Sequence, residues 1–175
     1  MADPELLERA HALLDLCRAK KLRVAAAESC TGGLLAATLT EIAGSSDVFE
    51  RGFVTYSNDA KQTMLGVAAG TLGNCGAVSR ETAQAMAKGA LAHAPAELAV
   101  SITGIAGPGG AVPGKPVGLV HFAAASRSGG LIQHKREYGD IGRAQIRRAA
   151  VLEALAMLTQ LAEAEQPQPG MTAHG

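Results

Sequence analysis

Residues 27–34, Ala-Glu-Ser-Cys-Thr-Gly-Gly-Leu, place a serine hydroxyl where it could do chemistry. An apolar run over residues 22–27 predicts a buried strand before Ser29, and residues 34–39 predict a helix after it. The first N–H groups of a helix have no partner within it, so a hydroxyl at this turn would face unpaired donors. Such donors can hold a phosphate or the oxyanion of an acyl-transfer reaction. The alternative is that Ser29 or Thr31 only caps the helix.

A lysine stands at the start of a second predicted helix. Asn58 predicts the N-cap of a short helix over residues 59–65, and Lys61 then falls in its first turn. A cation there opposes the helix macrodipole, so Lys61 does not serve the stability of this helix. One explanation is an exposed, solvated side chain. The other is a functional lysine whose neutral form is favoured by the positive end of the helix.

A glycine-rich turn, residues 103–110, follows a predicted strand over residues 97–103. Ligands collect at such turns in α/β sheets, and small residues allow close approach of the backbone. A flexible loop without function is the alternative. The run Gly109–Lys115 matches most of a Walker A motif, but Pro116 stands where the motif needs a hydroxyl, which excludes a P-loop. Val112 stands where a dinucleotide-binding fingerprint needs glycine, which excludes that motif.

Length and composition narrow the function classes. The 175 residues suffice for one domain with a core, and 47% of them are hydrophobic. A net charge of zero and 3% aromatic residues argue against a nucleic-acid partner. The apolar runs are short and the N-terminus lacks a signal-peptide pattern, so we expect no membrane span. The cysteines lack CxxC spacing, which argues against disulfides and zinc and favours a cytoplasmic location. They are Cys17, Cys30 and Cys75.

The hydrophobic pattern predicts the elements that must position these residues. Asp3 predicts the N-cap of a first helix, with Pro4 at its first position. The order of elements predicts an α/β sandwich, in which helices cover both faces of a mixed sheet. We expect one domain over residues 1–164 and a disordered tail over residues 165–175. Further predicted elements are a strand at residues 48–57, a glycine-rich connection at 66–76, a helix from Ser79 to about residue 94, strands at 117–125 and 131–138, and a helix at 143–164.

Four stretches stand in a distinctive order along the chain. They are Ala27-Glu28-Ser29-Cys30-Thr31-Gly32-Gly33, Tyr56-Ser57-Asn58-x-x-Lys61-x-x-x-Leu65-Gly66-Val67, Gly76-Ala77-Val78-Ser79, and Thr103-Gly104-Ile105-Ala106-Gly107-Pro108-Gly109-Gly110. Together they resemble the C-terminal domain of the competence/damage-inducible CinA family, whose stand-alone members are called PncC. The resemblance extends to Gly139-Asp140 and Arg143-x-x-Ile146-Arg147 and covers about residues 5–162. We expect the nucleotide-hydrolysing N-terminal domain of full-length CinA proteins to be absent.

The resemblance implies a three-layer α/β/α fold with a mixed, mostly parallel five-stranded sheet. It also implies a nicotinamide-nucleotide amidohydrolase, which converts nicotinamide mononucleotide and water to nicotinic acid mononucleotide and ammonia in pyridine nucleotide salvage. The implied partner is a small-molecule pyridine nucleotide, and neither a metal nor a cofactor is expected. We expect a homodimer, which is common among small α/β enzymes of this type.

Hydrolysis of an amide requires a nucleophile, a base and an oxyanion site. The five histidines suggest no Ser-His-Asp set, so a Ser–Lys pair is the economical choice. Ser29 would attack the carboxamide carbon, and neutral Lys61 would take the hydroxyl proton and return it to ammonia. Lowering the lysine pKa by about three units costs roughly 4 kcal/mol, so burial or a second cation must help. Arg143 or Arg147 could be that cation.

The other predicted site residues bind substrate. Backbone N–H groups of residues 30–33 would hold the oxyanion. The glycine-rich turn would hold the phosphate, with Arg143 as a bidentate partner unless it is an exposed helix residue. Tyr56 would line the pocket or donate a hydrogen bond, or else be a core tyrosine. The predicted binding residues are Cys30, Thr31, Gly32, Gly33, Tyr56, Thr103, Gly104, Gly107 and Arg143.

Two further hypotheses remain open from the sequence. Cys30 is adjacent to Ser29 and could be the nucleophile of a thiol mechanism, although neighbours on a tight turn point in different directions. The chain could also be a non-catalytic regulatory module that binds a pyridine nucleotide through the same glycine-rich loops. Substitution of Ser29 and Cys30 separately discriminates the nucleophiles, and binding without turnover would favour the regulatory module.

Overall fold

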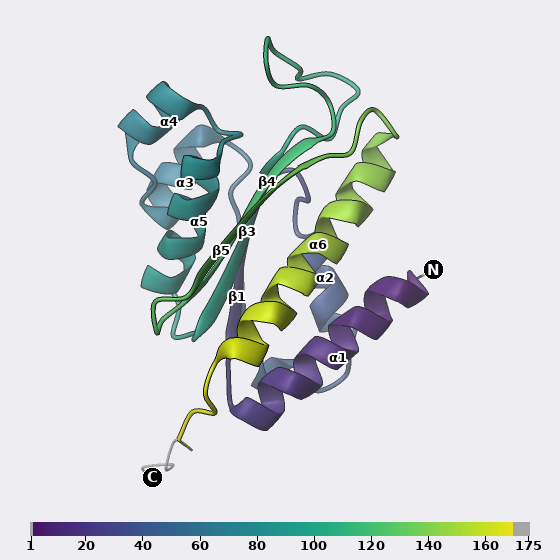
Figure 1. Ribbon diagram of the computed structural model, residues 1–175, viewed down its shortest axis with the longest axis vertical. Coiled ribbons are helices and arrows are strands. Elements are labelled where there is room, and N and C mark those ends of the chain that lie inside the picture. The colour runs from purple at the N-terminus through teal and green to yellow at the C-terminus, as the bar shows by residue number, and fades with distance from the viewer. Residues whose placement is uncertain (1, 170–175) are drawn as a thin grey trace.

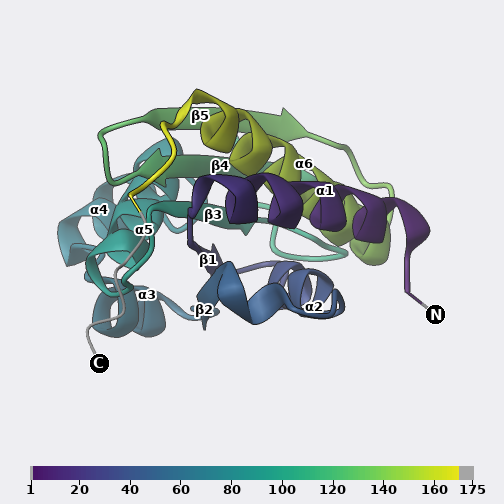
Figure 2. The same ribbon diagram turned by 90° about the horizontal axis from the view of Figure 1, so that it is seen from below.

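Five strands form one sheet that helices cover on both faces (Figures 1 and 2). The computed structural model describes residues 2–169. The strands are β1 (Val24–Glu28), β2 (Phe49–Val54), β3 (Leu98–Gly104), β4 (Leu119–Ser126) and β5 (Leu131–Glu137). The helices are α1 (Pro4–Lys20), α2 (Leu34–Thr40), α3 (Asn58–Leu65), α4 (Ala69–Cys75), α5 (Arg80–Ala92) and α6 (Arg143–Ala164). This is the predicted three-layer α/β/α fold.

The strand order is β2-β1-β3-β4-β5. β1 pairs in parallel with both β2 and β3, whereas β3–β4 and β4–β5 are antiparallel. Four of the five strands therefore point the same way, and β4 alone runs against them. Because β1, β2 and β3 are parallel, the segments that leave their carboxyl ends meet at one edge of the sheet. That edge is where ligands bind in open α/β sheets.

The two faces of the sheet are packed with side chains of different size. Successive residues of a strand point to opposite faces. On β3, the large side chains of Leu98, Val100 and Ile102 join the core that α1, α2 and α6 cover. Ala99 faces the other side and packs against α5. Ser101, also on that side, donates from Oγ to a carbonyl of α5. Small residues on this face let α5 lie close to the sheet.

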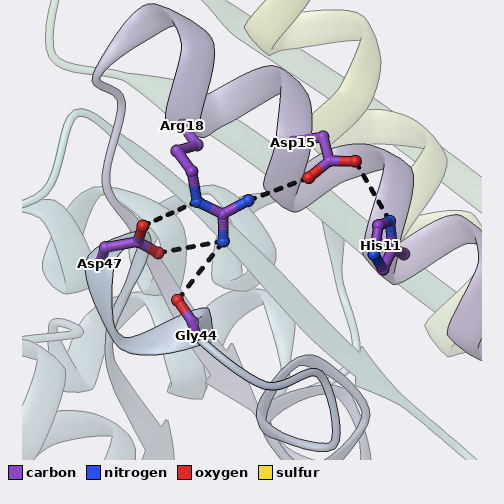
Figure 3. A network of polar contacts seen from close by, with 5 residues as sticks. All are labelled: His11, Asp15, Arg18, Gly44 and Asp47. Atoms are coloured by element: carbon purple, nitrogen blue, oxygen red, sulfur yellow. Dashed lines mark hydrogen bonds and ion pairs between the residues drawn. The ribbon is translucent and has the colours of Figure 1, made fainter.

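An exposed polar network connects the end of α1 to the turn that follows α2 (Figure 3). The guanidinium of Arg18 donates to both carboxylate oxygens of Asp47 and to the carbonyl of Gly44. Arg18 also pairs with Asp15, which in turn pairs with His11 one turn earlier. Exposed ion pairs of this kind contribute little stability individually. Their effect here is to hold the turn that leads into β2.

The structure corrects two details of the predicted elements. The connection over residues 66–76 contains the helix α4. The N-cap of α3 is Ser57, whose Oγ accepts from the Ala60 N–H, so Asn58 is the first helical residue rather than the cap. In the segment that follows α6, the Gln168 N–H donates to the carbonyl of Lys20, and the Nζ of Lys20 donates to the carbonyl of Glu165. Residues 170–175 lie outside the described part of the chain.

The remaining predicted elements are found with small shifts of their ends. Asp3 caps α1, as predicted, by accepting from the N–H groups of the first turn. Ser79 caps α5 in the same way, as also predicted, and accepts from the Thr82 N–H. Within residues 2–169, no helix combines the length and the apolar character that a bilayer crossing requires.

A substitution at Gly89 tests the close packing of α5 against α3. A Cβ added to Gly89 would overlap the carbonyl oxygen of Leu65, the last residue of α3. Gly89→Ala must push the two helices apart, and we expect the free energy of unfolding to fall by about 1–3 kcal/mol in chemical denaturation. The control is Gly73→Ala in α4, where an added Cβ meets nothing within 4 Å. That variant should keep or gain stability, and equal losses in both variants would contradict the prediction.

Candidate active site

Ser29 directly follows β1 and is held by the neighbouring strand. Its N–H donates to the carbonyl of Ile102 in β3 at 2.9 Å. The side chain is almost fully buried, and its Oγ lies 3.0 Å from the Nζ of Lys61. The backbone of the serine is therefore fixed by the sheet while its hydroxyl contacts a lysine from another element.

The start of α2 differs from the prediction. Its N-cap is Gly33, in the left-handed region at φ 101°, and no side chain caps it. Instead, the carboxylate of Glu28 accepts from the N–H groups of Leu35 (2.8 Å) and Ala36 (3.1 Å). Glu28 is fully buried, and a carboxylate is favoured at the positive end of a helix. The alternative that Ser29 or Thr31 caps the helix is therefore wrong, and the donors of α2 that Glu28 occupies do not face a ligand.

Lys61 is the largest fully buried side chain of the described residues, with 1% of its surface exposed. Its Nζ donates to the Thr55 carbonyl at 2.8 Å and to the Ser29 Oγ. Within residues 2–169 it forms no ion pair. Burial away from water lowers the pKa of Lys61, and the nearby Cys30 thiol opposes the shift. The predicted lowering of the pKa is found, but burial causes it rather than a second cation.

A cavity of about 290 Å³ opens above this pair at the carboxyl ends of β1, β2 and β3. Eight of the predicted site residues line it: Ser29, Cys30, Tyr56, Lys61, Thr103, Gly104, Gly107 and Arg143. The other three do not line it: Thr31, Gly32 and Gly33. The tertiary structure thus brings all four sequence motifs, which are far apart in the chain, around one space.

Arg143, the first residue of α6, spans the mouth of the cavity. Its Nη1 donates to the carbonyl of Gly107 at 2.7 Å, and its Nη2 donates to the hydroxyl of Tyr56 at 3.0 Å. Tyr56 is 62% exposed, so the alternative of a core tyrosine is wrong. These two bonds leave other N–H groups of the guanidinium free to contact a ligand. Thr103 is buried, and its hydroxyl donates to the carbonyl of Ala77.

The N–H groups of residues 30–33 differ in whether they are available. Within the described chain, only that of Gly32 donates to another residue, the carbonyl of Ser29, at 3.0 Å. The carbonyl of Thr31 accepts from Nη2 of Arg147 at 2.9 Å, and Thr31 is fully buried. Cys30 is thus the one residue of this turn that both lines the cavity and has an N–H without a partner in another described residue. Of these four N–H groups, that of Cys30 is therefore the one left available to a ligand in the cavity.

The thiol of Cys30 is less suited to chemistry than the hydroxyl of Ser29. Burial raises the pKa of the Cys30 thiol to about 11, so the reactive thiolate is disfavoured near neutral pH. No histidine lines the cavity. In the part of the chain that the structure describes, no group of three or more His, Cys, Asp or Glu side chains is placed to hold a metal ion.

Comparisons with known proteins agree with this architecture. The CinA C-terminal domain matches residues 7–162 of the chain. The chain belongs to the CinA C-terminal domain family. It is 48% identical to nicotinamide-nucleotide amidohydrolase PncC of Escherichia coli K12 over 161 residues, which are 91% of this chain and 96% of that protein. It is 53% identical over 118 residues to a CinA-like protein of Chlorobium phaeovibrioides, covering 67% of this chain.

Longer CinA proteins contain much more than this domain. The chain spans 28% of the Chlorobium protein and 30% of a putative competence-damage inducible protein from Caldicellulosiruptor bescii. Among solved structures, competence/damage inducible protein CihA from Agrobacterium tumefaciens matches with a TM-score of 0.90 at 54% identity, covering 92% of this chain and 98% of that one. ComA from Klebsiella pneumoniae matches with a TM-score of 0.87 at 36% identity, over 91% and 99% of the two chains. The predicted family and fold are confirmed.

The sequence of this CinA domain did not lead us to predict a binding or catalytic role for three residues that line the cavity. Ala77 and Val78 line the cavity from the segment before α5, and Asn58 lines it from the first turn of α3. A signal for the first two was present, since they belong to one of the four motifs. Asn58 was expected to cap α3, and Ser57 takes that place, which leaves the Asn58 side chain at the cavity.

The pKa of Lys61 predicts how stability depends on pH. Because the folded-state pKa is lowered, the unfolded chain binds the lysine proton more tightly, and stability rises with pH up to the ordinary lysine pKa of about 10.4. Lys61→Met removes this gain. As pH rises from 6 to about 10 in thermal unfolding, we expect the Tm of the wild type to increase relative to that of the variant. Lys88→Met, on the exposed side of α5, should show no such trend, and an identical trend would contradict the prediction.

Proposed function

We propose that the chain is a nicotinamide-nucleotide amidohydrolase, which hydrolyses the carboxamide of nicotinamide mononucleotide to give nicotinic acid mononucleotide and ammonia. The proposal depends mainly on the 3.0 Å contact between Ser29 Oγ and Lys61 Nζ beside the cavity. It is supported by the relative named nicotinamide-nucleotide amidohydrolase PncC, which aligns over nearly the full length of both chains.

The first half of the reaction acylates Ser29. Neutral Lys61 accepts the hydroxyl proton as Oγ attacks the carboxamide carbon. The Thr55 carbonyl accepts one N–H of Nζ, which leaves the nitrogen lone pair free to point at Ser29. The carboxamide oxygen becomes the oxyanion and accepts from the N–H of Cys30. Protonated Lys61 then gives its proton to the departing ammonia, and the tetrahedral intermediate collapses to an ester on Ser29.

The second half of the reaction releases the acid. A water molecule enters where ammonia left, and Lys61 takes one of its protons as the oxygen attacks the ester carbon. The oxyanion forms again at the Cys30 N–H. The bond to Ser29 Oγ breaks, Lys61 returns the proton to that oxygen, and the product leaves as the carboxylic acid, which ionises in water and gives its proton to the released ammonia. The net reaction consumes one water and needs no redox partner.

Arg143 and the glycine-rich turn would bind the phosphate end of the substrate. Arg143 is the cation at the cavity mouth, and its planar guanidinium suits a phosphate. Gly104, Gly107 and the glycines after them let the backbone come close to the ligand. Tyr56, exposed beside Arg143, would cover the nicotinamide or ribose. A pyridine nucleotide bound in this way places its charged end at solvent and its carboxamide at the buried pair.

The wider setting is part of the same proposal. The reaction would serve pyridine nucleotide salvage in the cytoplasm, where the three cysteines would stay reduced. Residues 1–164 would act as one catalytic domain. A homodimer is the proposed assembly.

Release of ammonia from nicotinamide mononucleotide tests the proposal. We expect Ser29→Ala and Lys61→Ala each to lower kcat at least about a thousandfold, since members of a catalytic dyad act as a unit. Cys30→Ala keeps the backbone donor and loses only the thiol, so turnover persists in that variant. An ammonium assay coupled to glutamate dehydrogenase measures all four proteins.

Thermal unfolding of each variant separates loss of chemistry from loss of fold. If Cys30→Ala alone abolishes turnover, Ser29 is not the nucleophile. If the wild type binds the nucleotide tightly but releases no ammonia, and Lys61→Ala binds equally well, the chain is a non-catalytic nucleotide-binding module instead.

A further inference from the structure

Arg147 lies one turn of α6 after Arg143 but points away from the cavity. Residues four apart share one face of a helix. Arg143 reaches the cavity mouth, whereas Arg147 reaches the turn behind Ser29. Its Nη2 donates to the Thr31 carbonyl at 2.9 Å, and an ideal Cβ on Gly32 would lie 3.7 Å from that nitrogen. The guanidinium is therefore packed against the backbone of the nucleophile turn.

Two peptide groups connect this guanidinium to the proposed oxyanion donor. The peptide that contains the Thr31 carbonyl also contains the Gly32 N–H, which donates to the Ser29 carbonyl at 3.0 Å. The peptide that contains the Ser29 carbonyl also contains the Cys30 N–H. A trans peptide holds its C=O and N–H in opposite directions. The Thr31 carbonyl thus accepts from Arg147 and also from the Leu34 N–H at 3.0 Å, and its hydrogen bonds continue through two peptides to the N–H of Cys30, a residue that lines the cavity.

A chain of hydrogen bonds of this kind makes the N–H group at its end, here that of Cys30, a stronger donor. Each hydrogen bond accepted by a carbonyl polarises the N–H of the same peptide, and the effect accumulates along a chain in a low-dielectric interior. The first donor here is a cation, and bonds from ionised donors are stronger than neutral ones. Within residues 2–169, Arg147 has no carboxylate within ion-pair distance, and its Nε is buried without a partner. Its positive charge is therefore not neutralised by a neighbouring carboxylate.

We propose that Arg147 is a positioning residue for the oxyanion site, which orients and polarises the Cys30 N–H through the peptides at Thr31–Gly32 and Ser29–Cys30. This inference rests on the proposed function, because it takes Ser29 as the nucleophile. Arg147 is not among the residues that line the cavity, so its proposed role is positioning and not contact with the substrate. Its contribution is to the transition state, where the oxyanion exists, and not to binding of the ground state.

The kinetic test compares three variants of α6. Arg147→Met removes the cation and its donor, and we expect kcat for nicotinamide mononucleotide to fall about tenfold or more with KM little changed. The fall should be smaller than the hundred- to thousandfold loss typical of deleting a direct oxyanion donor. Arg147→Lys keeps a cation and N–H donors, so it should recover part of kcat. Arg148→Met is the control, since the partners of Arg148 in the described part of the chain are Asp3 and Glu5, away from the nucleophile turn.

A second measurement, the NMR chemical shift of the Cys30 amide proton, tests the polarisation of the Cys30 N–H and does not depend on turnover. Labelling with ¹⁵N-cysteine gives backbone signals from three residues only, Cys17, Cys30 and Cys75, and Cys30→Ala identifies the relevant one by its loss. In Arg147→Met, the Cys30 amide proton should move upfield, because its N–H is less polarised. The signals of Cys17 and Cys75 should stay in place. Arg148→Met should move none of the three.

The outcomes separate this inference from the proposed function. If Ser29→Ala is inactive but Arg147→Met keeps kcat within twofold of the wild type, the role of Arg147 is overturned while the function stands. A change in KM alone, or an equal loss of kcat in Arg148→Met, also overturns it. If the wild type shows no turnover, the proposed function is wrong. The NMR measurement still tests the hydrogen-bond chain in that case, because an unchanged Cys30 signal in Arg147→Met would show that Arg147 does not polarise the Cys30 N–H.

Discussion

The burial of one lysine is the constraint on which the site depends. An ammonium group loses its hydration when it leaves water, and a carboxylate partner would restore the charged form. Within residues 2–169, the hydrogen-bond partners of Lys61 are one carbonyl and one hydroxyl, so its surroundings favour the neutral amine. That amine is the base a serine needs. Three elements position these partners: α3 contains the lysine, the residue after β2 supplies the Thr55 carbonyl, and Ser29 directly follows β1.

A buried carboxylate complements the buried lysine without touching it. Glu28 precedes the nucleophile and accepts from two N–H groups at the start of α2. Its negative charge is stabilised by the helix, so it need not pair with Lys61. The helix donors that seemed suited to a ligand are thereby used for structure. In the proposed mechanism, the turn at residues 29–32, held by bonds from Gly32 and Arg147, supplies the donor at Cys30 instead.

The position of the site is determined by the parallel strands and by the small residues on the face of the sheet that α5 covers. Parallel pairing of β1 with β2 and β3 brings three chain segments to one edge. Gly89 lets α5 pack against α3, whose last residue would otherwise collide with it. The position of Lys61 depends on that packing. The cavity is thus a consequence of where the sheet ends and how closely the helices approach it.

The sequence by itself determined the local features. Hydrophobic periodicity and capping residues such as Asp3 and Ser79 located most elements, because these signals act over a few residues. Ordered motifs identified the family and singled out Ser29 and Lys61. Only the tertiary structure decided what those residues touch. Burial of Lys61, the use of the α2 donors by Glu28, and the hydrogen-bond chain from Arg147 to Cys30 join segments as much as 117 residues apart (147 − 30). Desolvation and hydrogen-bond direction depend on three-dimensional neighbours, which no local pattern contains.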